Sequence, residues 1–118
     1  MRVLFDKNVP VGVRRFLAQY TVSTIVEMGW PERLENGELL RAAEASGFDV
    51  MVTSDQNIPY QQNLKGRKLS MIVLGSNTWP IVSEHAREIA EAVAEATPGS
   101  YRFIVMPLRP KTRRKSAE

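Results

Sequence analysis

The sequence predicts a single α/β domain built on a mostly parallel sheet. Short apolar runs alternate with segments of helical periodicity, and a chain of 118 residues that is 43% hydrophobic can bury one core. A strand-helix-strand order implies parallel strands, because each helix carries the chain back to the edge where the previous strand began. We therefore expect four to five strands in one sheet, with helices on both of its faces.

Five apolar runs have the composition of strands. Each is rich in Val, Ile, Phe or Met and is bounded by polar residues, Gly or Pro. They cover residues 2–5, 21–26, 49–53, 69–74 and 101–106. Helical spacing of apolar residues predicts one helix over residues 10–20, a second capped by Asn36 and stopped by Gly47, and a third over residues 80–96.

The positive charge of the chain is concentrated at one end. Residues 1–106 hold 11 basic and 12 acidic side chains, whereas residues 107–118 hold five basic and one acidic. The latter segment has two prolines and little apolar surface to bury, so we expect a domain over residues 1–106 and a basic disordered tail over residues 107–118. Such a tail can attract phosphates or simply keep the protein in solution.

Composition indicates a cytoplasmic protein. The chain has no cysteine, which excludes a disulfide framework and a thiolate metal site. No apolar run approaches the roughly 20 residues of a membrane span, so we expect no membrane partner. The N-terminal run MRVLF is interrupted at once by Asp6 and is too short for a secretory signal.

One motif occurs twice. The segments DKNVP (residues 6–10) and DQNIP (residues 55–59) each follow an apolar run directly. Their asparagines and prolines suit helix starts, but the aspartates stand earlier, at the tips of the first and third predicted strands. Ligands of open α/β sheets bind at the carboxyl ends of the strands. If these strands are neighbours, Asp6 and Asp55 lie within about 5 to 10 Å of each other.

Two carboxylates at that separation repel, and a hard divalent cation relieves the repulsion. Glu38, near the start of the second predicted helix, can join them, although an acid there is also favoured by the helix dipole alone. Asp6, Glu38 and Asp55, with the neutral oxygens of Asn8 and Asn57, would form an all-oxygen site suited to Mg²⁺ or Mn²⁺. Zinc suits it less, because the only histidine lies on the long third helix.

Basic side chains near the first strand tip are candidates for contacts with a nucleic acid. Lys7 and Asn8 follow Asp6 directly, and Arg14 and Arg15 lie on the first predicted helix. These four residues form the predicted nucleic-acid surface, although arginines on a helix are often simply solvated.

Three stretches, LFDKNVP, NGELLRAAEASGFDVMVT and TSDQN, resemble the short PIN-like family that is related to PIN-domain nucleases. The resemblance covers roughly residues 1–105. It implies a PIN-like three-layer fold and a metal-dependent ribonuclease whose acidic cluster holds Mg²⁺ or Mn²⁺ at the carboxyl edge of the sheet. Asp6, Glu38 and Asp55 correspond to the catalytic acids. The chain departs from many relatives at Asn57, where they carry a further acid.

The resemblance also implies partners. RNA would be the substrate, and many PIN domains are toxins of toxin-antitoxin pairs, which adds an antitoxin protein and a second copy of the chain as partners. Two other classes stay open. One is a PIN-like module that binds RNA or an antitoxin without cutting. The other is a phosphoacceptor receiver domain, although the first strand ends in one acid rather than a pair and no Lys follows the last strand.

Overall fold

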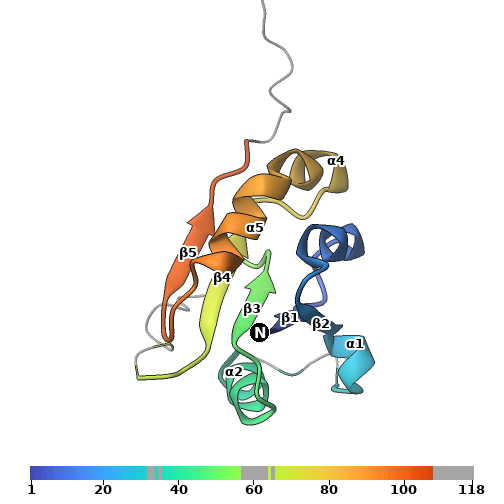
Figure 1. Cartoon of the computed structure of the whole chain (residues 1–118). Helices are drawn as coiled ribbons and strands as arrows, with labels where there is room; N and C mark the ends of the chain where they lie inside the picture. The colour runs from blue at the N-terminus through green and yellow to red at the C-terminus, as the bar shows by residue number, and fades with distance from the viewer. Residues whose placement is uncertain (32–33, 35, 57–63, 65, 108–118) are drawn as a thin grey trace, which may run out of the picture.

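The computed structural model describes residues 1–31, 34, 36–56, 64 and 66–107. Within them, five strands form one sheet in the order β2-β1-β3-β4-β5, and every neighbouring pair is parallel (Figure 1). The strands are β1 Arg2–Phe5, β2 Thr21–Thr24, β3 Val50–Thr53, β4 Ser70–Leu74 and β5 Tyr101–Ile104. The predicted α/β class is confirmed, and so is the expectation that the first and third strands are neighbours.

Helices cover both faces of the sheet, as in the three-layer arrangement expected of a PIN-like fold. Along the chain they are η1 Val11–Leu17, α1 Ile25–Met28, α2 Asn36–Ala45, α4 Trp79–Val82, η2 Ser83–His85 and α5 Ala86–Ala94. In Figure 1, α1 and α2 lie below the strands, and α4 and α5 lie above them. None of the helices in the described residues is long and apolar enough to span a membrane.

Alternation of side chains along the strands divides the core in two. Val3 and Phe5 of β1 join η1 and α5 in one buried cluster, whereas Leu4 between them joins α2 in a second cluster on the opposite face. The strands that are buried at every position, β3 and β4, therefore lie inside the sheet rather than at its edges, because both of their faces are covered.

The second strand ends earlier than predicted. Residues 21–26 were expected to be extended, but β2 stops at Thr24 and α1 begins at Ile25. The Thr24 hydroxyl accepts a hydrogen bond from the Glu27 N–H (3.1 Å), and the Glu27 carboxylate accepts one from the Thr24 N–H (3.0 Å). This capping box satisfies backbone donors that would otherwise lack partners at the helix start.

The predicted helices are also less regular than expected. Residues 11–17 form a 3-10 helix, and the long helix over residues 80–96 is divided into α4, η2 and α5. The division falls at His85, whose φ of −108° and ψ of 24° depart from helical values. The His85 side chain is buried and its Nδ1 pairs with the Glu88 carboxylate. The predicted tail lies outside the described residues from position 108 onward.

Packing of the edge strand β5 predicts that alanine substitution at two glycines has different effects on the free energy of unfolding. A Cβ on Gly75 would lie 2.8 Å from both the Ile104 carbonyl oxygen and the Met106 nitrogen, which are backbone atoms of β5 and its extension. We expect Gly75→Ala to lower the free energy of unfolding by about 1 to 3 kcal/mol, because β5 must shift away from β4. Urea denaturation measures the change.

The matched control is Gly37→Ala in α2. A Cβ there would meet only the Arg41 guanidinium at 3.6 Å, an ordinary contact. We expect this variant to be neutral or up to about 1 kcal/mol more stable, since alanine favours helices over glycine. Equal stability of the two variants would contradict the close approach of β5 to Gly75.

Candidate functional site

The strand order creates one point where the connections after neighbouring strands diverge. After β1 the chain passes through η1 into one core cluster, whereas Leu64, in the connection after β3, is buried in the cluster on the opposite face. Such divergence opens a crevice at the carboxyl ends of the two strands, which is where open α/β sheets bind ligands. The crevice between β1 and β3 is therefore the expected position of a ligand site.

Asp6 lies at this junction and is held in a fixed position. Phe5 pairs with Val52 in the sheet, so Asp6 and Thr53 follow at the same level. Asp6 is only 9% exposed, and its two carboxylate oxygens accept hydrogen bonds from the Lys7 N–H (2.7 Å) and the Thr53 hydroxyl (2.7 Å). A buried carboxylate needs such partners, and these fix the direction of its remaining lone pairs.

Thr53 links the two predicted acids. Its fully buried hydroxyl donates to Asp6 Oδ2 and accepts a hydrogen bond from the Asp55 N–H (3.1 Å). Because a hydroxyl has only one proton, the bond to Asp6 orients its lone pairs toward Asp55. The Asp6 side chain and the Asp55 backbone are thus joined through a single oxygen atom.

Asn8 and Ser54 form a second cross-link between the same strand ends. The Asn8 amide oxygen accepts from the Ser54 N–H (3.1 Å), and the Ser54 hydroxyl donates to the Asn8 carbonyl (3.1 Å). The alternative role of Asn8 as a helix cap is not observed: Pro10 is the cap residue of η1 and makes no side-chain capping bond. Asn8 instead fixes the separation of the two connections.

A polar pocket of about 490 Å³ lies at this edge. Three strand ends contribute to it: Asn8 follows β1, Asp55 follows β3 and Asn77 follows β4. Ser54 and Gln56 complete the described lining. Asp6 is not among the lining residues, but its carboxylate accepts from the Thr53 hydroxyl, which also accepts from the Asp55 N–H. The carboxylate and amide oxygens of this lining suit a hard cation, and its amide and hydroxyl donors suit a phosphate ester.

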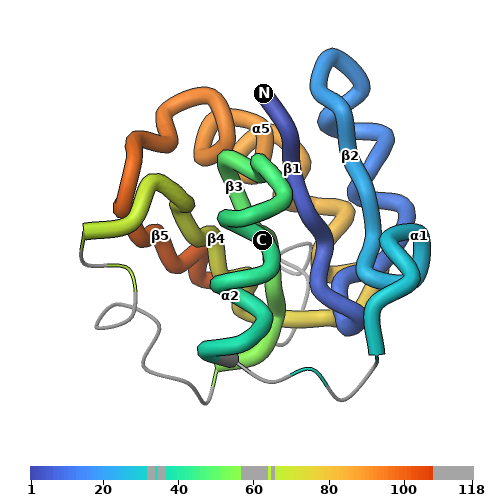
Figure 2. The backbone as a smooth tube through the Cα atoms, turned by 90° about the horizontal axis from the view of Figure 1, so that it is seen from below, coloured from blue at the N-terminus to red at the C-terminus, as the bar shows by residue number. Residues whose placement is uncertain are grey.

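Glu38 occupies an exposed position in the first turn of α2. Figure 2 shows α2 running opposite to β3, so that it begins toward the carboxyl edge. Within the described ranges, however, no three His, Cys, Asp or Glu side chains form a group that could hold a metal ion. Asn57, which was also predicted as a metal ligand, lies outside those ranges. The structure thus connects Asp6 with Asp55, and the participation of Glu38 and Asn57 stays a prediction.

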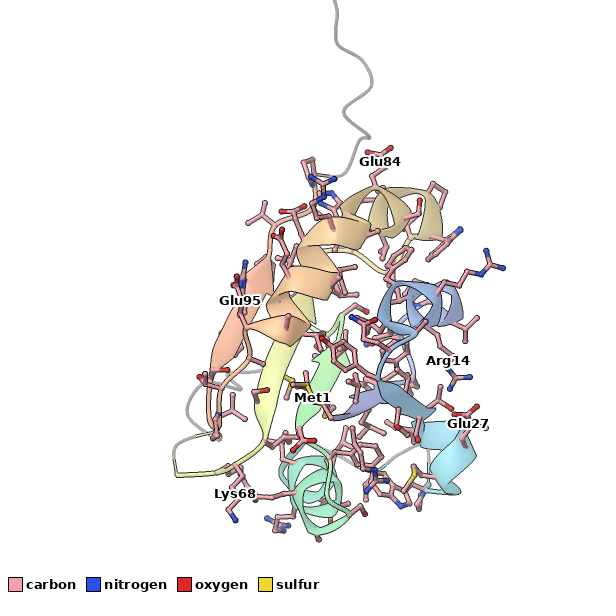
Figure 3. The ribbon with its side chains drawn as sticks, viewed as in Figure 1. Met1, Arg14, Glu27, Lys68, Glu84 and Glu95 are labelled. Atoms are coloured by element: carbon pink, nitrogen blue, oxygen red, sulfur yellow. The ribbon has the colours of Figure 1, made fainter. Side chains whose placement is uncertain are left out.

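The predicted basic contacts separate into two groups. Lys7 and Arg15 are exposed. Arg14, in contrast, donates to the Glu27 carboxylate (2.6 Å) and the Val22 carbonyl (3.3 Å), and Figure 3 shows the pair beside β2. The Arg14 guanidinium and the Thr24 N–H lower the pKa of Glu27 below its ordinary value. Arg14 therefore ties η1 to β2 and α1, a role that the sequence did not reveal.

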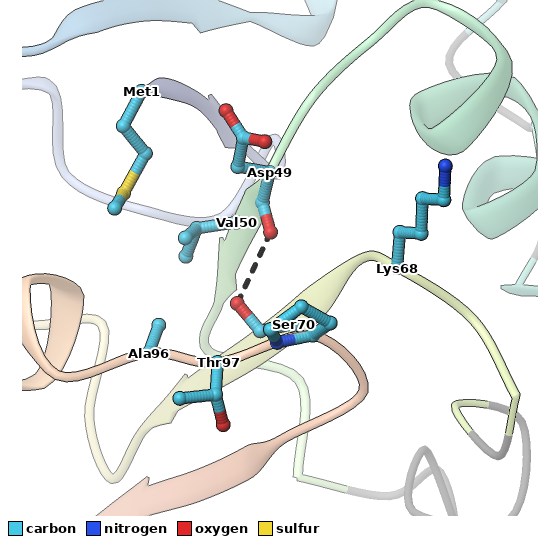
Figure 4. A pocket seen from close by; sticks show the side chains of 8 residues that line it. Met1, Asp49, Val50, Lys68, Ser70, Ala96 and Thr97 are labelled. Carbon is cyan, nitrogen blue, oxygen red and sulfur yellow. Dashed lines mark hydrogen bonds between the residues drawn. The ribbon is translucent and has the colours of Figure 1, made fainter.

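A further pocket, of about 350 Å³, lies at the opposite edge of the sheet (Figure 4). Asp49 and Lys68 line it, and the Ser70 hydroxyl donates to the Asp49 carbonyl (3.1 Å). This is the amino edge of the parallel strands, where Asp49 precedes β3 and Lys68 precedes β4. The pocket between the strand tips is the better candidate because ligands of such sheets bind at the carboxyl edge.

Thr53, Ser54 and Asn77 are site residues that sequence reasoning missed. The first two stand in the TSD segment, where hydroxyls directly before a strand-tip acid give a usable signal. Asn77 carries no such signal, because only the position of β4 beside β3 brings it to the pocket.

The hydroxyl linkage predicts the effect of two substitutions. Thr53→Val keeps the side-chain shape but leaves the buried Asp6 carboxylate and the Asp55 N–H without this partner, so we expect a loss of about 1 to 3 kcal/mol in the free energy of unfolding. Thr53→Ser should recover most of it. Chemical denaturation at neutral pH measures both. A Val variant as stable as the wild type would show that the hydroxyl bond contributes nothing.

Comparison with known proteins adds no relative. No family model, curated protein or solved structure matches the chain. The candidate site is therefore defined by its own residues, and the resemblance to PIN-like proteins stays a prediction.

Proposed function

We propose that this protein is a metal-dependent ribonuclease of PIN-like type, which hydrolyses RNA phosphodiester bonds in the pocket at the carboxyl edge. The observation that carries the proposal is the linkage of two aspartates from neighbouring strands through the Thr53 hydroxyl. If the Thr53 hydrogen bonds served only the stability of the fold, an acidic residue would not be needed at the tips of both strands. Two acids beside a polar pocket match the chemistry of a cation site.

The residues fit one divalent cation of the Mg²⁺ or Mn²⁺ type. Each Asp6 oxygen accepts one described hydrogen bond and retains a lone pair, and Asp55 and Asn77 bring a carboxylate and an amide to the pocket. Mg²⁺ is commonly held by one or two carboxylates with water completing its shell. When bound, the cation supplies an activated water and offsets charge on the phosphate.

The chain's own residues prepare that chemistry. Thr53 and the Lys7 N–H orient the Asp6 carboxylate, and the Asn8–Ser54 cross-link fixes the distance between the strand tips before any substrate arrives. Preorganisation of this kind reduces the rearrangement needed during the reaction. In the proposal, Glu38 orients the attacking water from α2, while Lys7 and Arg15 meet phosphates. Asn57 would contribute only a neutral oxygen, which favours one cation over two.

The biological role follows the resemblance. We place the protein in the cytoplasm as the toxin of a toxin-antitoxin pair, with RNA as substrate, an antitoxin protein as inhibitor and a second copy of the chain as a further partner. The non-catalytic alternative is a module that binds RNA or the antitoxin at the same pocket. Asn57, in place of an acid, is the residue that favours this alternative.

The strand order favours a second candidate function. The order 2-1-3-4-5, with an acid after β3, is shared with receiver domains that accept a phosphoryl group. In that case Asp55 would be the acceptor. Incubation with acetyl phosphate separates the classes: a stable phosphoryl adduct on Asp55, without RNA cleavage in any metal, would move the assignment to the receiver class.

Divalent metal is expected to stabilise the folded protein. Millimolar Mn²⁺ or Mg²⁺ should raise the melting temperature, because a ligand that binds only the native state shifts the folding equilibrium. The double variant Asp6→Asn, Asp55→Asn should show no such shift. Differential scanning calorimetry measures the effect, and a wild-type melting curve unchanged by metal would favour the non-catalytic module.

Cleavage of single-stranded RNA tests the function directly. We expect activity in Mn²⁺ or Mg²⁺, loss of activity with chelator, and at least a hundredfold decrease, on the order of one lost catalytic group, in Asp6→Asn or Asp55→Asn. The amide variants keep the side-chain size, which limits damage to the fold. Asn57→Asp should raise turnover if a missing acid limits metal binding.

Asp49→Asn is the matched control for this experiment. Asp49 precedes β3 at the amino edge, where its carboxylate accepts from the Arg2 N–H (2.8 Å), so the same chemical change is made far from the pocket. Its activity should equal that of the wild type. Equal losses in Asp49→Asn and Asp55→Asn would point to a contaminant or to misfolding rather than to this site.

A further inference from the structure

A third pocket, of about 360 Å³, lies along the connections that leave the proposed active site. It is lined by Pro10, Val11, Gly12, Arg15 and Trp79. Asn8 and Asn77, which line the first pocket, stand two residues before Pro10 and Trp79 respectively. Two residues span at most about 7 Å, so the two pockets are close enough for successive nucleotides of one strand.

The Trp79 ring is held in place and yet exposed. It stacks on Phe16, with ring centroids 5.8 Å apart and an interplanar angle of 16°. Gly12 lies directly against the indole, because a Cβ there would fall 2.4 Å from the ring. Despite these contacts Trp79 is 38% exposed, and the neighbouring Val11 is 75% exposed.

Exposure of this ring is not explained by the core. Phe16 is partly buried and packs against the buried cluster on this face, and a smaller apolar residue at position 79 would cover it with less apolar surface in water. An aromatic ring that is fixed by packing and open to solvent is, however, the arrangement with which proteins stack unpaired bases.

The positive charge beside the Trp79 ring suits the negatively charged backbone of a nucleic acid. Arg15 is exposed and lines the same pocket as Trp79, and the described lining of this pocket contains no acidic side chain. A guanidinium next to an aromatic ring can hold the phosphate of the nucleotide whose base lies on that ring. A protein partner, unlike a nucleic acid, has no regularly spaced phosphates that could pair with this guanidinium.

We infer that Trp79 and Arg15 form a nucleotide-binding subsite for single-stranded RNA, with a base stacked on the indole and its phosphate paired with the guanidinium. This inference rests on the proposed action on RNA and adds the position of a neighbouring nucleotide. Stacking needs no metal, so the subsite is occupied even when chelator prevents cleavage. Any base is accepted, because every base has a flat face.

Tryptophan fluorescence provides the test. The chain has two tryptophans, and Trp30 packs edge-on against Phe48 in the opposite core cluster. In the Trp30→Phe variant, Trp79 is the only reporter. A short oligouridylate added in EDTA should quench its fluorescence saturably, whereas the wild type should show the same midpoint with a smaller fractional change.

Substitutions measured with fluorescein-labelled oligouridylate complete the test. By anisotropy in EDTA, Trp79→Leu should bind about 5- to 100-fold more weakly, as expected for loss of one stacked base. Arg15→Gln should bind more weakly and reduce the salt slope by about 0.7. Arg41→Gln, an exposed arginine of α2 on the opposite face, is the matched control and should bind as the wild type does.

The outcomes separate this inference from the proposed function. Quenching without cleavage in any metal would support the subsite and remove the nuclease proposal. Cleavage, or binding by anisotropy, without quenching of Trp79 would overturn the subsite alone. Absence of all binding in EDTA would also overturn it. Because quenching is read in a chain that retains Trp79, instability of Trp79→Leu does not affect this decision.

Discussion

The hydroxyl of Thr53 is the contact on which the candidate site depends. It is fully buried between the ends of β1 and β3, and it joins the Asp6 carboxylate to the Asp55 backbone. A carboxylate that is 9% exposed is tolerated only when its oxygens have hydrogen-bond partners. Thr53 meets that need by donating to Asp6 and, by accepting a second hydrogen bond from the Asp55 N–H, positions the chain that carries the second acid. The Thr53 hydroxyl therefore contributes both to the stability of the sheet edge and to the geometry of the pocket.

The topology explains why this contact forms between β1 and β3. The order β2-β1-β3-β4-β5 places the first and third strands side by side, and the connections after them pass to opposite faces. At this junction the polar groups that follow β1 and those that follow β3 find partners in each other. The bonds between Asn8 and Ser54 supply the second cross-link. The pocket is the space left above these links.

The same edge brings aromatic and polar chemistry together. Asn77 and Trp79 follow β4, so one connection contributes an amide to the polar pocket and an indole to the next one. Gly12 allows the indole to approach η1, and Phe16 supports it. A strand of RNA passing from one pocket to the other would meet phosphate-binding and base-stacking groups in turn, which is the combination that single-stranded nucleic acids require.

The sequence by itself determined the strands, their parallel direction and the position of Asp6 and Asp55 at strand tips, because these follow from local apolar patterning and from the short-range motif Asp-x-Asn-aliphatic-Pro. It did not determine the ends of β2 or the division of the long helix, where Thr24 and His85 act through their own side-chain bonds. Only the tertiary structure decided which groups meet at the site. Thr53 donates a hydrogen bond to Asp6, which is 47 residues away in the sequence, and Arg14 pairs with Glu27. Asn77 lines the pocket because β4 pairs with β3. Such contacts depend on strand order, which a periodic pattern cannot specify, since each strand carries the same apolar signal whatever its neighbour.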